Sequence, residues 1–428
     1  MQPLSSYTLA DPKVMQNPYP YYERLRAEDP VHFDEGIQTW LVTRYEDLVA
    51  VARNTEVYSD EMRVSESIRS PFRAEADEYM EREGFVVLDG SNTFKIDGEV
   101  HTRRRKLVAN AFTGPNVAAM EPRVAAICRD RAATFLNRAE EVDLLREYAK
   151  PIPILVICDA LGLSLDHVDE ISRAADSMVA RAGAGATREV AYQHANNVMQ
   201  LQRFVRRAIE ERRVKPGTDL ISQLAHARID DPAAPQLTDR EVVSISAVAV
   251  AGGVDTTRNT IAFGLYTLAT RPDLLKRLQQ SKQQDKDLGR FGDETLRFYS
   301  VVPQLPRITK TETVLGGKTI PQGSNVFLCW ASGNRDPQRF ADPDTFDIDR
   351  ANLSHHLAFG TGVHHCIGAI LARQEIKCAI REIVNNVESL ELAVPPDQLD
   401  LSGTMVILRG LNSLPLRLRG KGHLRLSH

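Results

Sequence analysis

One cysteine stands in a loop punctuated by glycines, and a segment of helical composition follows it directly. The loop is Phe359–Gly368, with the sequence FGTGVHHCIG, and the helical segment is Ala369–Glu375. The amides and the dipole at the beginning of a helix lower the pKa of a nearby thiol and favour its thiolate. The glycines allow turns that other residues avoid, and Gly368 lets the backbone approach a flat partner closely. The sequence therefore predicts a thiolate ligand at Cys366.

Two plainer interpretations of Cys366 stay open on the residues alone. Free cysteine is usually a small core residue, so a structural cysteine before a helix would look the same. A cysteine–histidine nucleophile pair is the second alternative. His364 and His365 are sequence neighbours of the cysteine, whereas catalytic partners normally come from distant parts of the chain.

The loop resembles the haem-binding loop of the cytochrome P-450 monooxygenases. The shared pattern is Phe-Gly-x-Gly-x-x-x-Cys-x-Gly, with five specified residues in ten consecutive positions. The resemblance implies that Cys366 is the proximal thiolate ligand of the iron in haem b. It also implies that His364 contacts a haem propionate and that Phe359 packs beside the thiolate, with Gly368 against the haem.

Composition and charge describe an ordinary globular protein. Of the 428 residues, 43% are hydrophobic and 26% are charged, with a formal net charge of −4. This balance gives no reason to expect a nucleic-acid partner, whose binders carry basic patches. No stretch approaches the roughly 20 apolar residues that span a bilayer, and Met1–Tyr7 lacks the basic and apolar regions of a signal peptide. We therefore expect no membrane insertion.

The five cysteines are few, odd in number and widely spaced. Such a set does not form a disulfide framework, and no paired spacing suggests a zinc site. We therefore expect a reducing cytoplasm as the compartment. Together with the resemblance, the expected lack of a membrane anchor implies the soluble bacterial kind of monooxygenase.

A strongly basic helix is predicted from His101, where the sequence reads HTRRRKLV. A basic run is most often a solvated helix face. The spacing His-Thr-x-x-Arg also resembles the helix of the family whose histidine and arginine hold a haem propionate, which implies these roles for His101 and Arg105. The fork of a guanidinium group suits a carboxylate.

The longest predicted helix begins at Thr238 and ends before Pro272. Thr238 and Glu241 have capping-box spacing, in which a hydroxyl is followed three residues later by a carboxylate. The middle contains Gly252 and Gly253, which together cost a helix roughly 2 kcal/mol relative to alanine. A tolerated kink would explain them. The resemblance implies instead the distal helix over the haem, where the two glycines make room for dioxygen.

An acid–alcohol pair, Asp255 and Thr256, follows these glycines. The resemblance implies that Thr256 hydrogen-bonds the bound dioxygen and that Asp255 relays protons from solvent. Productive cleavage of the O–O bond needs two protons on the distal oxygen, while the thiolate donates electron density from the other side. Asp255 and Thr256 are therefore the predicted catalytic residues.

The segment after this helix carries a predicted ion-pair network and a further haem contact. Glu294 and Arg297 stand at i and i+3, which is a common pair on any helix. Their position resembles the structural Glu-x-x-Arg of the family, with Arg350 as the expected third member. Arg307 follows Arg297 by ten residues and corresponds to another propionate-binding arginine of the family.

The expected substrate pocket is apolar, which favours a hydrophobic small molecule, although a plain core would also be apolar. By position, its residues are Val248, Ala251, Val302, Leu305, Met405 and Val406. The charged stretch from Ser59 to Gly98 ends in Phe85–Gly90. This end is either a strand with a turn or part of a solvated surface insertion.

We expect one mainly α-helical domain with small β-sheets over residues 1–428, the cytochrome P-450 fold, with no fused reductase and acting as a monomer. The implied reaction inserts one oxygen atom of dioxygen into a substrate, as in hydroxylation or oxidative demethylation. Electrons would come from NAD(P)H through a ferredoxin reductase and a ferredoxin.

We further predict that His365 faces a proximal surface that docks an acidic ferredoxin, together with basic Arg103, Arg104 and Lys106. Reversing the charge of Arg104 would then weaken reduction at low salt. Two other classes stay open, namely a peroxide-driven haem-thiolate peroxygenase and a haem-thiolate sensor or carrier without catalysis.

Overall fold

The computed structural model describes residues 3–60, 70–88, 96–136, 138, 141–180, 186–400 and 408–421. The chain divides into two units. Unit 1 comprises Met1–Ser59, Glu121–Ile152 and Thr256–His428, whereas unit 2 comprises Asp60–Met120 and Pro153–Asp255. Among the described helices, those that continue from one unit into the other are α6 (Gly114–Ala133), α7 (Pro151–Leu161) and α11 (Asp239–Thr270).

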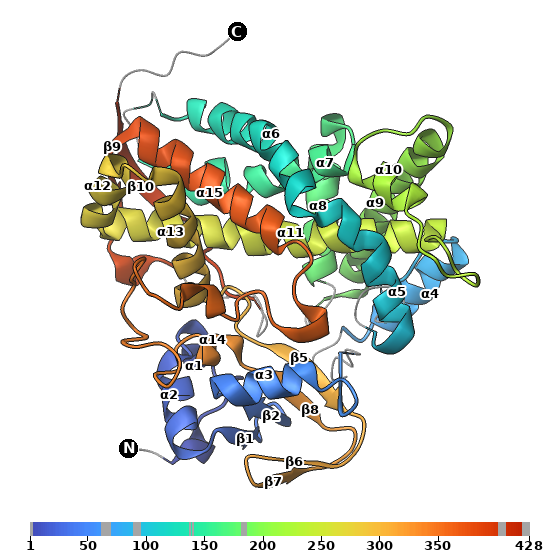
Figure 1. The fold of residues 1–428 in the computed structure, drawn as a ribbon, viewed down its shortest axis with the longest axis horizontal. Helices are drawn as coiled ribbons and strands as arrows, with labels where there is room; N and C mark the ends of the chain where they lie inside the picture. Colours follow the sequence, from blue (N-terminus) through green and yellow to red (C-terminus); the bar gives the residue numbers. More distant parts are fainter. Residues whose placement is uncertain are drawn as a thin grey trace. The chain divides into compact units, whose positions relative to one another are not determined.

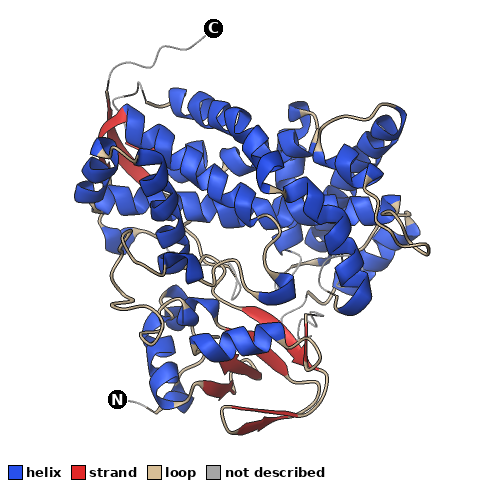
Figure 2. Ribbon diagram, viewed as in Figure 1, coloured by secondary structure: helices blue, strands red, loops and turns tan. Residues whose placement is uncertain are grey.

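Unit 1 combines helices with small sheets (Figures 1 and 2). Its own helices are α1 (Pro12–Gln16), α2 (Tyr19–Glu28), α3 (Tyr45–Arg53), α12 (Pro272–Gln280), α13 (Gln284–Tyr299), α14 (Trp330–Gly333) and α15 (Ala369–Asn386). Short helical turns are η1 (Leu4–Ser6), η5 (Leu145–Ala149), η7 (Leu353–His355), η8 (Gly362–His364) and η9 (Pro396–Gln398). Proline at the first turn begins α1, α2 and α12, where its missing N–H has no helical partner to lose.

The largest sheet of unit 1 has the strand order β1-β2-β8-β5-β3. Its strands are β1 (Val31–Asp34), β2 (Thr39–Val42), β3 (Tyr58–Ser59), β5 (Leu305–Thr309) and β8 (Asn325–Leu328). The β2–β8 pair is parallel and the others are antiparallel, with Arg307 opposite Val326. The smaller sheets are β4 (Glu141–Asp143), β10 (Pro415–Gly420) and β9 (Val387–Leu392), and the hairpin β6 (Thr313–Leu315) and β7 (Lys318–Ile320).

Helix α3 covers one face of the five-stranded sheet, as Figure 1 shows. Its residues Leu48 and Val51 pack in one core cluster with Leu328 of β8 and Trp330 of α14. Burial of such side chains stabilises a fold by about 1.5–3 kcal/mol each. The end of α3 is therefore a firm support for the segments that contact it.

Unit 2 is built from helices around the long α9. Its elements are α4 (Arg73–Arg82), α5 (Gly98–Ala109), η4 (Asn110–Phe112), η6 (Leu165–His167), α8 (Val168–Ala180), α9 (Arg188–Val214) and α10 (Leu220–His226). The Thr187 side chain caps α9 by accepting a hydrogen bond from the amide of Val190. Met80 of α4 packs in one cluster with Val198 and Met199 of α9.

Both predictions for Phe85–Gly90 are wrong over its described part, residues 85–88. This segment forms no strand, and Phe85 and Val86 are buried, so it is not a solvated insertion either. Gln202 of α9 takes the place of a neighbouring strand: its amide donates to the carbonyl of Val86 (2.7 Å) and accepts from its N–H (2.9 Å). Buried backbone groups need such partners, and here a distant side chain supplies them.

The predicted long helix is confirmed as α11, which begins directly after Thr238. No helix in the described part of the chain has both the length and the apolar content that crossing a bilayer requires.

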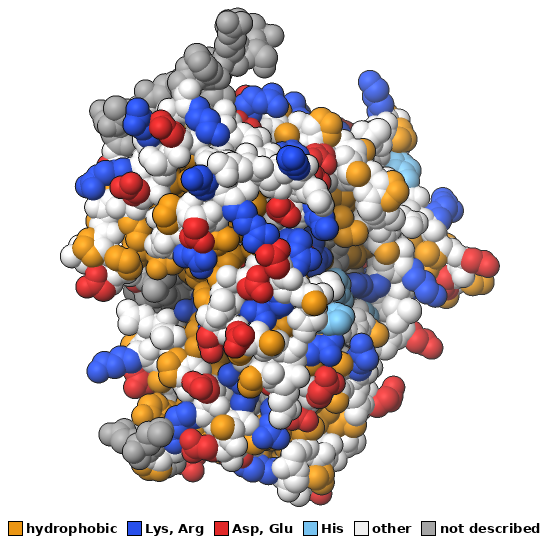
Figure 3. Space-filling model, turned by 60° about the vertical axis from the view of Figure 1, so that its left-hand side comes forward, with side chains coloured by type: hydrophobic (Ala, Val, Ile, Leu, Met, Phe, Trp, Pro, Cys, Tyr) orange, Lys and Arg blue, Asp and Glu red, His pale blue; other side chains and the backbone are white. Residues whose placement is uncertain are grey.

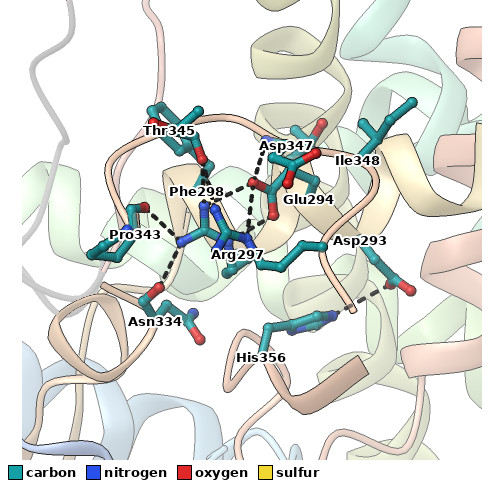
Figure 4. Close-up of polar contacts among 12 residues, drawn as sticks. Asp293, Glu294, Arg297, Phe298, Asn334, Pro343, Thr345, Asp347, Ile348 and His356 are labelled. Carbon is teal, nitrogen blue, oxygen red and sulfur yellow. Dashed lines mark hydrogen bonds and ion pairs between the residues drawn. The ribbon is translucent and has the colours of Figure 1, made fainter. Parts of the chain in front are cut away.

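The predicted network of Glu294, Arg297 and Arg350 is confirmed, and Figure 4 shows the pair Glu294 and Arg297. Arg297 donates to both carboxylate oxygens of Glu294 at 2.7 and 2.8 Å, and neither side chain has exposed area. Arg350 Nε lies 3.7 Å from Glu294. Arg297 also donates to the carbonyls of Asn334 and Pro343, both at 2.8 Å. A buried charge pair with these extra hydrogen bonds fixes a long irregular segment of unit 1.

Replacing Glu294 with Gln leaves the Arg297 cation buried without its counter-charge. We expect the free energy of unfolding to fall by about 3–5 kcal/mol, the usual cost of breaking a buried pair, measured by urea unfolding. The matched control is Asp349→Asn, which breaks the exposed pair with Arg277. An exposed pair contributes about 1 kcal/mol or less, so equal losses in the two variants would contradict the assignment.

Candidate functional site

Cys366 differs from the other cysteines in its accessibility. All five cysteines lie in the described part of the chain; Cys366 is exposed and the other four are buried. Burial raises the pKa of Cys158 to about 12 and that of Cys378 to about 11, which keeps both as thiols. Because a metal ligand must be a thiolate with a reachable sulfur, Cys366 is the suitable cysteine. The interpretation of Cys366 as a buried structural residue is wrong.

The loop before Cys366 is held by backbone contacts. Gly360 and Gly362 have φ values of 66° and 76°, which side chains rarely adopt. A Cβ on Gly362 would lie 2.7 Å from the carbonyl oxygen of Ala52, at the end of α3. The Cys366 N–H donates to the carbonyl of Phe359 at 2.9 Å. The loop therefore rests on α3 and closes on itself, which fixes the cysteine through its backbone.

The sequence did not predict a polar cluster of Asp293, His356 and Arg373 that packs against Phe359. The Arg373 guanidinium of α15 lies over the Phe359 ring, 4.6 Å from its centroid, and donates to Asp293 of α13 at 2.7 Å. His356 lies 3.3 Å from the same carboxylate and accepts from the amide of Ala358 (Figure 4). The cluster ties the loop to two helices. An acid directly before Glu294 was the available signal, but its partners lie 63 and 80 positions away.

Asp293 is ionised in this cluster. Burial by itself would raise the pKa of its carboxyl group, but His356 and Arg373 outweigh the burial and hold the pKa below its usual value. The ionised Asp293 therefore contributes fully to the stability of the fold above the pKa that its carboxyl group has in the unfolded chain. This contribution is lost as the pH falls through the lower pKa of the folded state.

Three further predicted haem contacts lie in unit 1 with Cys366. Arg307 is buried on β5, and one guanidinium nitrogen donates to the carbonyl of Pro306 at 2.8 Å. His364 is half-buried in η8. A Cβ on Gly368 would lie 4.0 Å from the Cys366 sulfur, so glycine leaves the space beside the sulfur clear.

The middle of α11 has one accessible face. Val248 and Thr256 are half-buried and Gly252 is exposed, whereas Val250, Val254 and Thr257 are buried. Val248, Gly252 and Thr256 are one helical turn apart and share a face. A Cβ at Gly252 would meet no heavy atom within 4 Å among the described residues. Beside this face, Asp255 is 5% exposed, so the predicted catalytic carboxyl group is held mostly out of bulk solvent.

Three of the other predicted pocket residues lie in the described part of the chain. Ala251 is half-buried on α11, and Val302 and Leu305 are half-buried at the connection from α13 to β5. Met405 and Val406 lie outside the described residues.

Of the three basic residues of α5 that were predicted to dock a ferredoxin, Arg104 is buried and Arg103 is half-buried. Arg104 is 8% exposed, and both arginines form ion pairs with Glu241 of α11 within unit 2. Only Lys106 of the three is exposed. The predicted propionate contacts lie elsewhere on α5, with His101 buried and Arg105 half-buried one turn later. On the face drawn in Figure 3, basic and acidic side chains are interspersed.

The residues present fit a haem with a thiolate ligand. Unit 1 supplies one exposed sulfur on a rigid loop, and Gly368 leaves the space beside it clear. It also supplies the buried cation Arg307. Described by itself, unit 2 carries His101 and Arg105 at i and i+4 on α5. A soft anionic ligand suits the iron, and guanidinium groups suit the propionates.

The comparisons with known proteins agree with this chemistry. The family model described as Cytochrome P450 matches residues 185–287 and 288–412. The cytochrome P450 monooxygenase PikC of Streptomyces venezuelae is 34% identical over 408 residues, covering 94% of this chain and 91% of that protein. The vitamin D(3) 25-hydroxylase of Pseudonocardia autotrophica is 33% identical over 408 residues, covering 94% of each.

A solved structure has the same fold. The crystal structure of CYP109E1 from Bacillus megaterium in complex with testosterone matches with a TM-score of 0.79 and 29% sequence identity. The match covers 94% of this chain and 99% of that chain. The expected fold class, mainly α-helical with small β-sheets, is confirmed.

Replacing Gly362 with Ala should disturb the cysteine loop, because the new Cβ would collide with Ala52 and the positive φ is strained for alanine. We expect a smaller fraction of thiolate-ligated haem after reconstitution, measured from the absorbance of the reduced protein under carbon monoxide. Gly323→Ala is the matched control, since Gly323 also has a positive φ (79°) but a Cβ there meets no atom of the described residues within 4 Å. The same loss in both variants would show that backbone strain alone, not the contact with α3, is responsible.

Proposed function

Because this chain belongs to the cytochrome P450 family, and is a monooxygenase of that family, we propose that it hydroxylates a hydrophobic small molecule with dioxygen and two electrons. In the balanced reaction, a C–H bond and dioxygen, with two electrons and two protons, give an alcohol and water. The observation that carries the proposal is the exposed Cys366 on a loop fixed by α3, among four buried cysteines. Oxidative demethylation would follow from the same insertion next to a heteroatom.

In this proposal haem b is the cofactor, and when bound it would supply the reductive activation of dioxygen and the oxygen transfer. Cys366 would ligate its iron, with Phe359 and Gly368 beside the sulfur. His101, Arg105, Arg307 and His364 would pair with the propionates, because cations and N–H donors stabilise buried carboxylates.

Asp255 and Thr256 would deliver protons to the dioxygen cosubstrate. The Thr256 side chain belongs to the accessible face of α11, where its hydroxyl would donate a hydrogen bond. Asp255 is buried one position earlier, and its carboxyl group would pass protons on to the hydroxyl. Gly252, one turn before Thr256, would leave room for dioxygen, since it has no side chain.

The proposed substrate class is an apolar molecule of small to medium size. Val248, Ala251, Val302 and Leu305 are half-buried apolar residues, and they would contact it together with Met405 and Val406. A relative named for hydroxylating vitamin D(3) and a solved structure with testosterone act on or bind apolar polycyclic molecules. A screen of such compounds for the spin-state change on binding would identify the substrate.

Separate redox proteins would supply the electrons. We propose a ferredoxin and its NAD(P)H-dependent reductase as donors, for a chain that acts as one domain and as a monomer in the cytoplasm. The five cysteines, all in the described part of the chain, are not joined in disulfides, and a reducing compartment would keep them so. In this proposal the exposed Lys106 of α5 would contact the ferredoxin, whereas Arg103 and Arg104 are paired with Glu241.

Removal of the thiolate tests the cofactor. In the reduced protein under carbon monoxide, we expect the red-shifted Soret band of thiolate ligation, and Cys366→Ala should abolish it because the sulfur ligand is lost. The matched control is Cys378→Ala, which removes a buried thiol on α15 and should keep the band. A normal band in Cys366→Ala would refute the ligand assignment.

Replacing Thr256 with Ala tests proton delivery. With a ferredoxin system and a substrate from the screen, we expect the rate of product formation to fall about 10²-fold, as when a general acid–base group is lost. Oxygen uptake should continue and release hydrogen peroxide. Thr256→Ser retains the hydroxyl and should restore most of the product. A substrate-binding protein without oxygen uptake would indicate a sensor or carrier, and turnover supported only by peroxide would indicate a peroxygenase.

A further inference from the structure

Glu241 closes the capping box at the beginning of α11. Its Oε2 accepts hydrogen bonds from the amide and the hydroxyl of Thr238 at 2.9 and 3.2 Å, and its own N–H donates to the Thr238 hydroxyl at 3.2 Å. These bonds satisfy amides that the first turn of a helix leaves without partners. One carboxylate oxygen is therefore used for local structure.

The other carboxylate oxygen, Oε1, joins α11 to α5 within unit 2. It accepts from Arg104 Nε at 3.0 Å and from Arg103. Arg103 also donates to the carbonyl of Gln236 at 3.2 Å. Arg104 is 8% exposed and Glu241 is mostly buried, so solvent screens these ion pairs only weakly.

Glu241 remains ionised in this position. Burial by itself would raise the pKa of the carboxyl group, but the Thr238 amide and the two arginines outweigh the burial and hold the pKa below its usual value. The carboxylate is thus available to both helices at neutral pH.

The two arginines restrain the rotation of α5. They are consecutive residues, so their side chains leave the helix about 100° apart and converge on one oxygen. A helix held from two directions cannot turn about its axis without breaking one bond. His101 and Arg105 are one turn apart on the same helix, with Arg104 three positions after His101, and the direction in which their side chains leave the helix is set by this rotation.

We propose that Glu241 is a positioning residue for the cofactor: by binding Arg103 and Arg104 it sets the rotation of α5 and so orients His101 and Arg105 toward the haem propionates. The inference rests on the haem binding proposed above and goes beyond it. It also assigns a role to the basic run of α5 that a solvated face or a docking surface does not explain. Glu241 also links α5 to α11, the helix that carries Asp255.

The test is the rate at which haem leaves the protein, measured by transfer to excess apomyoglobin. Glu241→Gln keeps an oxygen for the capping box but removes the charge that both arginines need. We expect haem loss to be about tenfold faster, as when a residue supporting a metal-site ligand is lost. The midpoint potential of the haem should shift as well, because the propionate charges are paired differently.

Asp219→Asn is the matched control. Asp219 also caps a helix, α10, by accepting from the amide of Ser222 at 2.9 Å, and also binds an arginine, Arg212, at 2.7 Å. It has the same two tasks in the same unit but acts on α9 and α10. Haem loss in this variant should stay at the wild-type rate. Equal acceleration in Glu241→Gln and Asp219→Asn would mean a general loss of stability and would overturn the proposal.

A double variant separates positioning from folding. Glu241→Gln combined with Arg104→Met removes the buried cation together with its partner, so the free energy of unfolding should recover. Haem loss should remain fast, because α5 is still not fixed. A wild-type rate of haem loss in the double variant would overturn the proposal. A wild-type protein that takes up no haem would overturn the proposed function and this inference with it.

Discussion

The buried ion pair between Glu294 and Arg297 is the interaction on which the cysteine loop of unit 1 depends. Two charges without exposed area are costly to bury, and here Arg297 donates five hydrogen bonds, two of them to Glu294. Arg297 binds the carbonyls of Asn334 and Pro343, and Glu294 binds the amide of Asp347. The irregular segment fixed in this way leads to His356 and Phe359. Helix α13 thereby fixes the position of a loop that has little regular structure of its own.

A thiolate ligand needs a rigid backbone and an accessible sulfur. In this loop different residues provide the two properties. Rigidity comes from Gly362 against α3, from the hydrogen bond between Cys366 and Phe359, and from the Arg373 guanidinium over the Phe359 ring. Accessibility comes from Gly368, which places no side chain beside the sulfur. The other four thiols are buried in the core and stay protonated. Cysteine is therefore a structural residue at four positions and a suitable ligand at one.

In unit 2, Glu241, Arg103 and Arg104 join two helices by ion pairs. Glu241 caps its own helix with one oxygen and holds α5 with the other, so a local signal and a tertiary contact share one side chain. Gln202 acts similarly when it pairs with the backbone of Val86. In both cases a single polar side chain replaces regular secondary structure as the link between segments that are far apart in the sequence.

The sequence by itself determined the features that depend on neighbouring residues: the cysteine loop, the capped helix α11, the pair Glu294–Arg297 and the helical spacing of His101 and Arg105. Their physics acts within one loop or one helical turn. Only the tertiary structure decided which charges are exposed. Arg104 looked like a surface residue because its partner, Glu241, is 137 positions away. The segment at Phe85 was predicted as a strand or a solvated insertion because the partner of Val86, Gln202, is 116 positions away. Burial and pairing arise from long-range contacts, which a local pattern of residues does not contain.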